Sequence, residues 1–317
     1  MKEQIQVSVI VVTYNPDEKA LQVTLDSIIR QKNVEFEVII TDDGSEKKDF
    51  SWIPGYFKAH AIERYKIFEH SKNVGTVRNF LAGIQAAEGK YIFGTSPGDL
   101  LFDELVLVDF YNYAIDKNAK ILFGNAIHYA VAASVPYVTK NYSIPLNPDI
   151  YSSNDNRGKY SFFFGNWIIG ASYFRERECA QKYISQISEV CKYAEDSPST
   201  AFALAAGEKV YYFDRNIVWY EDGTGISTGG SEKWKIILMQ EYAKAFQLLR
   251  TMFPKDPLVD IAYIKYTSSN KQEEILRKLI KHPLVILKKK ISVRFKQKKM
   301  KVTSEDLLGL QSMLMGD

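Results

Sequence analysis

The first hundred residues alternate short apolar runs with amphipathic segments, and this alternation constrains the fold more than any other feature of the sequence. Val7–Thr13 is an almost unbroken β-branched run, typical of a strand buried on both faces of a parallel sheet. Similar runs follow at Phe36–Thr41, Tyr65–Glu69 and Tyr91–Phe93, with helical patterns before the second and the fourth. Strands that alternate with helices predict a doubly wound α/β sheet with its chemistry at the carboxyl ends of the strands.

Polar side chains follow the first, second and fourth of these runs. Thr13-Tyr14-Asn15 ends the first, Asp42-Asp43-Gly44-Ser45 follows the second, and Asp99 follows the fourth. Carboxylates at such positions can accept a hydrogen bond from a nucleobase N–H or a ribose hydroxyl, or they can bind a hard divalent cation. Asp and Gly are also common in any tight turn, so each motif alone is compatible with a purely structural role. Together they predict one ligand-binding crevice.

Two further groups carry chemistry. Arg78 opens a helical pattern, where its charge and the free backbone N–H groups suit a phosphate, although a single Arg is also common on a solvated surface. Glu195-Asp196 stands where a later helix begins, and it is either a helix cap or a general base for an acceptor hydroxyl. No Walker-A or GxGxxG sequence follows the first strand, which argues against kinase and dinucleotide-binding functions.

The remainder of the chain is less regular. Strands are expected at Ile121–Tyr129, Trp167–Phe174, Val210–Phe213 and Ile217–Tyr220, a helix at Lys192–Ala206 and a loop at Asn141–Lys159. The Gly-rich segment Asp222–Gly230 is either a lid over a ligand or an ordinary surface loop. From Glu232 the pattern is helical, with breaks at prolines. We therefore expect a catalytic domain at 1–230, with a nucleotide-binding half at 1–100 and an acceptor half at 101–230, and a helical region at 231–317.

The net charge of +3 conceals a basic segment near the C-terminus. Arg277–Lys301 holds 11 Lys and Arg residues and no acidic one, so the rest of the chain has 41 − 11 = 30 basic and 38 acidic residues. Leu, Ile, Val and Phe are interspersed among these charges, a composition typical of an interfacial helix or helix pair on an anionic membrane. A nucleic-acid site and a solvated helix face are the alternatives, but no other feature of the chain calls for nucleic acid.

The expected location follows from the same composition. No apolar stretch reaches the length of about 18 residues that a membrane-spanning helix needs. The N-terminus also lacks the pattern of a signal peptide, because strand-like sequence begins almost at once. We therefore expect a cytoplasmic protein that lies peripherally on the inner face of the cell membrane.

The motifs resemble, in order, those of family 2 glycosyltransferases of the GT-A fold. The resemblance rests on Val7–Asn15, Thr41–Ser45, Asn73-Val74-Gly75 with Arg78-Asn79, Ala87–Ile92, and the spacing to Asp99 and Glu195-Asp196. It covers roughly residues 5–225. It implies a Rossmann-like, mostly parallel sheet and an inverting transfer from a nucleotide-diphospho-sugar, with a UDP-sugar as the favoured donor and Mn²⁺ or Mg²⁺ as cofactor.

The resemblance also implies roles for the motif residues. The nucleoside pocket would be lined by Thr13, Tyr14 and Asn15, and uracil and ribose would be held by Asp42 and Asp43, with Asp43 on the base. Arg78 would lie near the base and the diphosphate, and Asp99 would bind the metal. The catalytic base would be Asp196, with Glu195 beside it. Only one acid remains in the metal motif at Ser96–Asp99. Metal binding is then weakened, or it rests on Asp99, the diphosphate and water.

The acceptor is less constrained than the donor. The chain lacks the QxxRW signature of processive synthases and their transmembrane helices, which favours transfer of a single sugar. The basic segment favours a lipid-linked saccharide of capsular or surface polysaccharide synthesis, and Asn166 and Trp167 are candidate acceptor residues, although Trp167 also suits a core. The alternative is a non-catalytic GT-A partner subunit. A sugar-phosphate nucleotidyltransferase would need a Gly-rich basic loop where Tyr14-Asn15-Pro16 stands, and a homo-oligomer is compatible with all these features.

Overall fold

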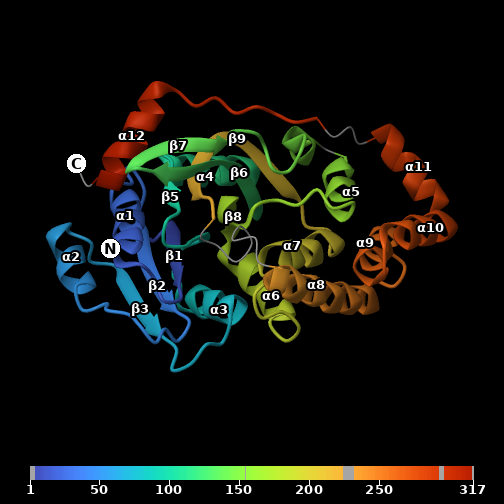
Figure 1. The fold of residues 1–317 in the computed structure, drawn as a ribbon, viewed down its shortest axis with the longest axis horizontal. Coiled ribbons are helices and arrows are strands. Elements are labelled where there is room, and N and C mark those ends of the chain that lie inside the picture. The colour runs from blue at the N-terminus through green and yellow to red at the C-terminus, as the bar shows by residue number, and fades with distance from the viewer. Residues whose placement is uncertain (1–3, 154, 224–231, 293–295, 316–317) are drawn as a thin grey trace.

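A twisted mixed sheet with helices on both faces forms the centre of the molecule (Figure 1). The structure is a computed structural model that describes residues 4–153, 155–223, 232–292 and 296–315. The strands are β1 (Val7–Thr13), β2 (Phe36–Asp42), β3 (Tyr65–Glu69), β4 (Tyr91–Thr95), β5 (Leu100–Leu101), β6 (Ile121–Ala132), β7 (Val135–Lys140), β8 (Tyr173–Glu176) and β9 (Val210–Glu221). They pair in the order β3-β2-β1-β4-β8-β6-β9-β5, with β7 beside β6.

The four N-terminal strands form the parallel half of the sheet, as predicted. Alternate residues of β1 serve opposite faces: Val9 packs in one cluster with Leu25 of α1 (Glu18–Ile29), and Ile10 packs in another with Ile84 of α3 (Thr76–Ala86). This burial on both faces explains the unbroken apolar run. Asp17 caps α1 by accepting a hydrogen bond of 2.9 Å from the backbone N–H of Ala20. The helices α2 (Ile53–Ala59) and α4 (Val106–Lys117) complete this half.

The second half of the sheet is mixed, because β8 runs antiparallel to both β4 and β6. The predicted strand at Trp167–Phe174 is wrong in its position: a 3-10 turn occupies Gly170–Ser172, and the strand is Tyr173–Glu176. The two predicted strands at 210–220 form one strand, β9, whose register with β6 shifts near Asn125. Such a shift interrupts the ladder without ending the strand, which a sequence pattern does not reveal.

Helices connect and cover the mixed half. The expected loop at 141–159 contains a 3-10 helix at Pro148–Ser152 and the start of α5 (Arg157–Phe163). Helix α6 (Arg177–Ile187) packs against α3 and against α7 (Asp196–Ala205). The predicted helix at 192–206 is confirmed, although it begins at Asp196.

The C-terminal region consists of α8 (Glu232–Met252), α9 (Pro257–Thr267), α10 (Lys271–Lys281), α11 (Pro283–Ser292) and α12 (Ser304–Met315). It does not have a separate core: Phe246 of α8 and Val259 of α9 belong to the same apolar cluster as Ile10. Leu310 and Met313 of α12 pack with Val23 of α1 at the other end of the molecule. The expected boundary at residue 230 therefore separates β9 from α8 in the chain but does not divide the core.

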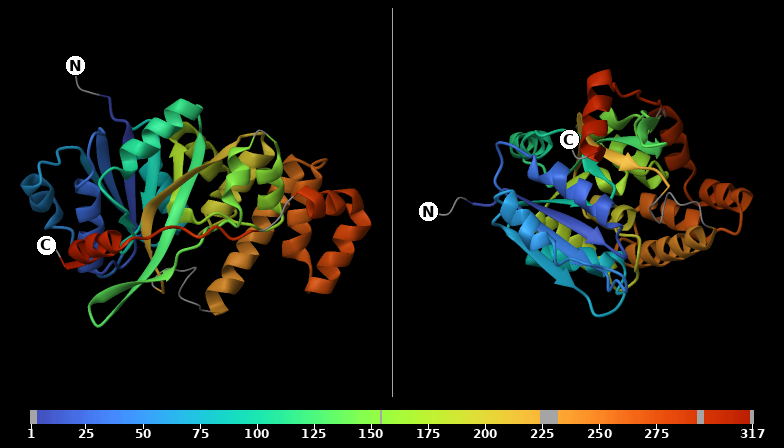
Figure 2. Two further views of the ribbon diagram at one scale, coloured as in Figure 1. Left: turned by 90° about the horizontal axis from the view of Figure 1, so that it is seen from above. Right: turned by 60° about the vertical axis from the view of Figure 1, so that its left-hand side comes forward.

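The basic segment 277–301 forms the expected helix pair only in part: residues 277–281 end α10 and residues 283–292 form α11. After α11, residues 296–303 run as an extended strap over the body toward α12 (Figures 1 and 2). Lys298 accepts a backbone hydrogen bond from Ser143, and Met300 donates one to Asn141, so backbone pairing holds the strap down. Among the described helices, none combines the length and the apolar composition needed to cross a bilayer.

Candidate functional site

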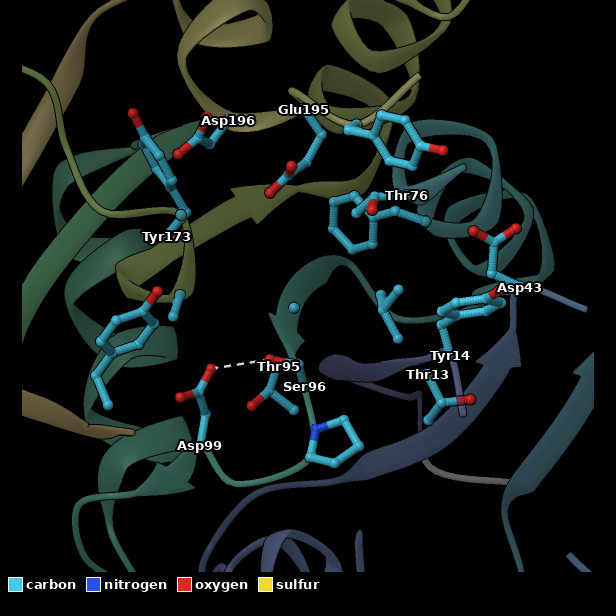
Figure 3. A pocket seen from close by; sticks show the side chains of 18 of the residues that line it. Thr13, Tyr14, Asp43, Thr76, Thr95, Ser96, Asp99, Tyr173, Glu195 and Asp196 are labelled. Atoms are coloured by element: carbon cyan, nitrogen blue, oxygen red, sulfur yellow. Dashed lines mark hydrogen bonds between the residues drawn. The ribbon is translucent and has the colours of Figure 1, made fainter. Parts of the chain in front are cut away.

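A cleft of about 570 Å³ opens at the carboxyl ends of β1 and β4 and is closed on the other side by the start of α7 and by α8 (Figure 3). Of the predicted site residues, it is lined by Thr13, Tyr14, Asn15, Asp43, Asp99, Glu195 and Asp196. In Figure 3, Glu195 and Asp196 lie across the cleft from Asp99, while Asp43 and Tyr14 occupy one end. The predicted convergence of strand ends on one crevice is confirmed.

Asp43 lies at one end of the cleft and is held by the loop that precedes α3. Its carboxylate accepts hydrogen bonds from the backbone N–H groups of Val74, at 2.6 Å, and Gly75, at 2.9 Å. Burial raises the pKa of Asp43, although these hydrogen bonds oppose the shift. Gly44 has φ +69°, and a Cβ there would lie 2.3 Å from the carbonyl carbon of Lys72. Only glycine therefore permits the close approach of the two loops that frames Asp43.

Tyr14 and Asn15 join the first two loops at the mouth of the cleft. The side chain of Asn15 accepts hydrogen bonds from the backbone N–H groups of Glu46, at 3.1 Å, and Lys47, at 3.3 Å. Asn15 has φ +46°, a left-handed conformation that Asn adopts more readily than most residues. Tyr14 is 54% exposed, so its ring is free to contact a ligand.

Asp42 does not line the cleft, in contrast to its neighbour. It is fully buried, forms an ion pair with Lys48 at 2.8 Å, and accepts a hydrogen bond from Thr13 Oγ1 at 3.0 Å. Ser45 donates to it through both its backbone N–H and its hydroxyl. Burial alone would raise the pKa of Asp42, but the bonds from Lys48, Ser45 and Thr13 outweigh it and lower the pKa. Asp42 thus organises the loop that presents Asp43.

We expect Asp42→Asn to lower the free energy of unfolding by about 1–3 kcal/mol, because it weakens several bonds to a buried charge. Chemical denaturation at neutral pH measures this change. Glu46→Gln, an acid-to-amide change in the same loop at a side chain exposed to solvent, is the matched control and should leave stability unchanged. A stable Asp42→Asn protein would contradict the role assigned to this carboxylate.

Arg78 also lies outside the cleft. It is the third residue of α3, so the predicted position at a helix start is confirmed, but its side chain is 54% exposed and pairs with Glu189 at 3.4 Å. Thr76, at the first position of α3, lines the cleft instead. Some N–H groups of that helix end already have partners, because Gly75 donates to Asp43 and Val77 donates to the carbonyl of Lys192 at 3.0 Å.

Asp99 and Glu221 place two carboxylates side by side. Asp99 is 5% exposed and accepts hydrogen bonds from Ser96 Oγ at 3.0 Å and from the backbone N–H of Glu221 at 3.1 Å. Burial, with a further contribution from the negative charge of Glu221, raises the pKa of Asp99 to about 7. Gly98 makes the approach possible, because a Cβ there would lie 2.2 Å from Glu221 Oε2. Sequence reasoning missed Glu221, which stands at the end of β9 with no motif around it.

These residues fit a divalent cation that is shared with a ligand. Carboxylate and hydroxyl oxygens are the donors that Mg²⁺ and Mn²⁺ prefer, and a cation would offset the repulsion between Asp99 and Glu221. In the part of the chain that the structure describes, no group of three or more His, Cys, Asp or Glu side chains is placed to hold a metal by itself. Oxygens of a diphosphate would therefore have to complete the coordination.

Glu195 and Asp196 enter the cleft from the start of α7. A Cβ on Gly170 would lie 3.2 Å from both Glu195 Oε1 and Asp196 Oδ2, so both carboxylates lie next to this glycine. Burial raises the pKa of both groups, and the charge of Asp196 raises that of Glu195 further. Arg175 on β8 acts in the opposite direction and favours their ionised forms. A carboxylate with a raised pKa suits a general base.

Arg175 therefore opposes the rise in pKa that burial causes in this pair. We expect Arg175→Met to move the acidic limb of the pH–rate profile of transfer to higher pH by about 1 unit, since the base must be deprotonated and the variant raises its pKa. Arg175→Lys keeps the charge and should shift the limb less. Profiles of kcat for the three proteins measure the effect, and superimposable limbs would show that Arg175 does not act on the pair.

The candidate acceptor residues Asn166 and Trp167 lie outside the cleft. Asn166 is buried and bonds to both backbone groups of Leu146, at 2.8 and 2.7 Å. Trp167 packs among Phe162, Tyr242 and Tyr266, with ring centroids 4.8–6.4 Å apart. Both residues stabilise the fold behind the cleft, which agrees with the core alternative for Trp167.

The wall beside Glu195 and Asp196 is instead formed by Tyr173, Tyr193, Leu238 and Tyr242. Two of these come from α8, a helix that sequence reasoning had placed outside the catalytic domain. The suggested lid, Asp222–Gly230, lies outside the described residues except for Asp222 and Gly223. Asp222 is bonded to His128 Nδ1 at 2.7 Å.

Known proteins share this architecture. A model described as "Glycosyl transferase family 2" matches residues 8–176, more than half of the chain. The "Uncharacterized glycosyltransferase EpsJ" of Bacillus subtilis (strain 168) is 25% identical over 219 residues, which cover 68% of this chain and 61% of that protein. This chain therefore spans about three fifths of the length of that relative.

Solved structures agree on the fold. TarS 1–349 of S. aureus in complex with UDP has a TM-score of 0.56 at 16% identity, covering 92% of this chain and 76% of that one. The mannosyltransferase PcManGT of Pyrobaculum calidifontis, in complex with GDP-Man and Mn²⁺, has a TM-score of 0.54 at 14% identity, covering 99% and 86%. The expected α/β fold of GT-A type, with a mostly parallel mixed sheet and a helical C-terminal region, is confirmed. The family match, together with the motifs in the cleft, leads to one conclusion: this chain belongs to glycosyltransferase family 2.

Proposed function

We propose that this enzyme transfers a single sugar from a UDP-sugar to an acceptor hydroxyl, with inversion at the anomeric carbon. The observation that carries the proposal is the cleft, which holds Asp43 at one end, Asp99 and Glu221 along one side, and Glu195-Asp196 across from them. A nucleotide-diphospho-sugar needs a contact for its base, a countercharge for its diphosphate and a base near its anomeric carbon. The TarS structures with UDP and UDP-GlcNAc support a nucleotide-sugar donor.

In this mechanism Asp43 binds the nucleobase and Tyr14 packs at the mouth of the cleft. Asp196 removes the proton of the acceptor hydroxyl as that oxygen attacks the anomeric carbon from the face opposite the nucleotide. Burial raises the pKa of Asp196, and the charge of Arg175 opposes this shift and favours the ionised form. Asp99, Ser96 and Glu221 would hold a divalent cation, which supplies Lewis-acid stabilisation of the leaving diphosphate. Attack from the opposite face converts an α-linked donor into a β-linked product.

We further propose that the acceptor is a lipid-linked saccharide of capsular or surface polysaccharide synthesis. The basic, apolar composition of 277–301 supports this, because a lipid-linked acceptor would be presented at a membrane. The aromatic side chains of Tyr173, Tyr193 and Tyr242 support a saccharide next to the base. Arg78, Asn166 and Trp167 take no part in this proposal.

The second candidate is a non-catalytic subunit of a glycosyltransferase complex. The single acid in Ser96–Asp99 favours it, whereas Glu221 beside Asp99 and the retained pair Glu195-Asp196 oppose it. Burial of carboxylates in one cleft costs free energy, and strongly perturbed pKa values cluster at functional sites, which supports an active enzyme.

A panel of donors tests the proposal. Release of nucleotide from UDP-, GDP- and dTDP-sugars is measured with and without Mn²⁺, using the full chain. We expect release from one UDP-sugar above the rate of spontaneous hydrolysis, and a higher rate with Mn²⁺. Release from a GDP- or dTDP-sugar alone would correct the donor, and release from none, with nucleotide binding retained, would support the non-catalytic subunit.

A further inference from the structure

Helix α10 is amphipathic, but its charged side faces the body and its apolar side faces solvent, the reverse of an ordinary surface helix. Glu274 and Lys278 are buried, at 8% and 7% exposure, and form an ion pair of 2.6 Å on the side that faces the body. The opposite side carries Ile275, Leu276 and further apolar residues into solvent. Apolar side chains normally face the core, so this arrangement indicates that something else covers the outer side.

The apolar surface continues onto α11. The outer face of α10–α11 consists of Ile275, Leu276, Leu279, Ile280, Leu284 and Leu287, which are 47–78% exposed. The spacing of these residues places them on one side of each helix, and the inner side of α11 contacts the body through Val285. The two helices lie at the end of the molecule opposite β3 (Figure 1).

The charges around this face are mostly basic. Glu273, which pairs with Arg277 at 3.4 Å, stands one turn before Leu276, but from Arg277 to Lys301 the sequence contains no Asp or Glu. Lys281 and Lys288 are exposed beside the face, where Lys281 lies 3.9 Å from Asp260 and the ammonium of Lys288 lies over the ring of Tyr160. The rest of the chain has an acidic excess of 38 − 30 = 8. An anionic surface would thus attract this end of the molecule and repel the remainder, which fixes an orientation.

We propose that the outer face of α10–α11 docks on a bilayer that contains anionic lipids. Its Leu and Ile side chains enter the acyl boundary, and Lys281 and Lys288 contact the headgroups. Of the strap, Lys298 is directed to the body instead, because it is paired with Asp149, at 2.9 Å, and Asp214, at 2.6 Å. The inference does not depend on the donor or on catalysis.

Two other occupants fit less well. A second copy of the chain in a two-fold contact would bring two surfaces of the same basic charge together, which is repulsive. Nucleic acid would satisfy the lysines but would leave six aliphatic side chains without partners, since single strands stack on aromatic rings and duplexes present phosphates.

Flotation of the full chain with vesicles tests the proposal. Vesicles of phosphatidylcholine with phosphatidylglycerol are compared with phosphatidylcholine alone, at low and high salt. We expect the protein to float with the anionic vesicles at low salt and to be partly released at high salt, because salt screens the charges but not the apolar contacts. Lys281→Ala should lower the partition coefficient about fivefold.

The double variant Ile280→Glu/Leu284→Glu should lower the partition coefficient by about tenfold or more, since it places two anions in the inserted face. The matched control is Ile115→Glu/Val135→Glu, at side chains 45% and 54% exposed elsewhere on the fold, and it should float like the parent. Circular dichroism and release of nucleotide in solution should be the same for all variants, which separates this test from that of the proposed function.

Three results would overturn the proposal. The first is a full chain that stays with the soluble fraction on anionic vesicles at low salt. The second is a double variant that floats like its parent. The third is a dimer, detected by light scattering, that the double variant abolishes; it would assign the face to a second copy of the chain. An oligonucleotide that binds through Lys281, with no binding to vesicles, would likewise assign the face to nucleic acid.

Discussion

Asp196→Asn is expected to abolish sugar transfer while leaving donor binding near that of the parent protein. The amide keeps the shape of the side chain, and its hydrogen bond to the backbone N–H of Ser197, but it cannot accept a proton. Loss of a general base typically lowers kcat by about 10²–10⁴-fold. Transfer assays at saturating donor measure the loss, and calorimetry with UDP measures donor binding.

Glu195→Gln is the matched comparison, because it changes the adjacent carboxylate in the same way. We expect it to reduce transfer less and to move the acidic limb of the pH profile little, since the pKa of Asp196 is governed by its burial, by its hydrogen bonds and by Arg175. The opposite result, an inactive Glu195→Gln and an active Asp196→Asn, would exchange the two roles. Full activity in both would favour the non-catalytic subunit.

Asp43→Ala is expected to weaken UDP binding by about 1–3 kcal/mol, or about 5- to 150-fold in Kd, because a hydrogen bond to a buried group is lost. Part of this loss comes from the loop at Val74 and Gly75, whose N–H groups Asp43 also holds. Calorimetry with UDP and with uridine separates a contact to the base from one to the diphosphate, since a base contact weakens both ligands equally.

Asp42→Asn provides the control for that experiment. It alters the preceding carboxylate, which lies behind the cleft, and should lower stability with a smaller change in Kd. Equal losses of UDP affinity in the two variants would mean that the loop, rather than the Asp43 carboxylate, binds the nucleotide. Unchanged affinity in Asp43→Ala would remove Asp43 from the donor site.

Much of the donor half was predictable because its signals are local. Apolar runs such as Val7–Thr13 indicate buried strands, and the polar residues that follow them must lie at one edge of a parallel sheet. Thr13, Asp43 and Asp99 therefore reached the same cleft as expected. The prediction failed where it depended on side-chain direction: Asp42 and Arg78 belong to the right segments but point away from the cleft.

The acceptor half was predicted less well because its parts are distant in sequence. Glu221 approaches Asp99 across 122 residues, and only the pairing of β5 with β9 brings them together. Trp167 is placed by aromatic partners from α8 and α9. No local pattern carries information on such contacts, since they depend on how complete elements pack.

The sequence by itself determined the succession of strands and helices in the first hundred residues, the edge at which ligands bind, and the presence of carboxylates and a basic, apolar segment. Those properties follow from periodicity and composition, which are local. Only the tertiary structure decided that Asp43 rather than Asp42 faces the cleft, that Glu221 joins Asp99, and that α10 turns its ion pair inward and its leucines outward. Each of these depends on which neighbour a side chain meets, and packing of distant segments sets that neighbour.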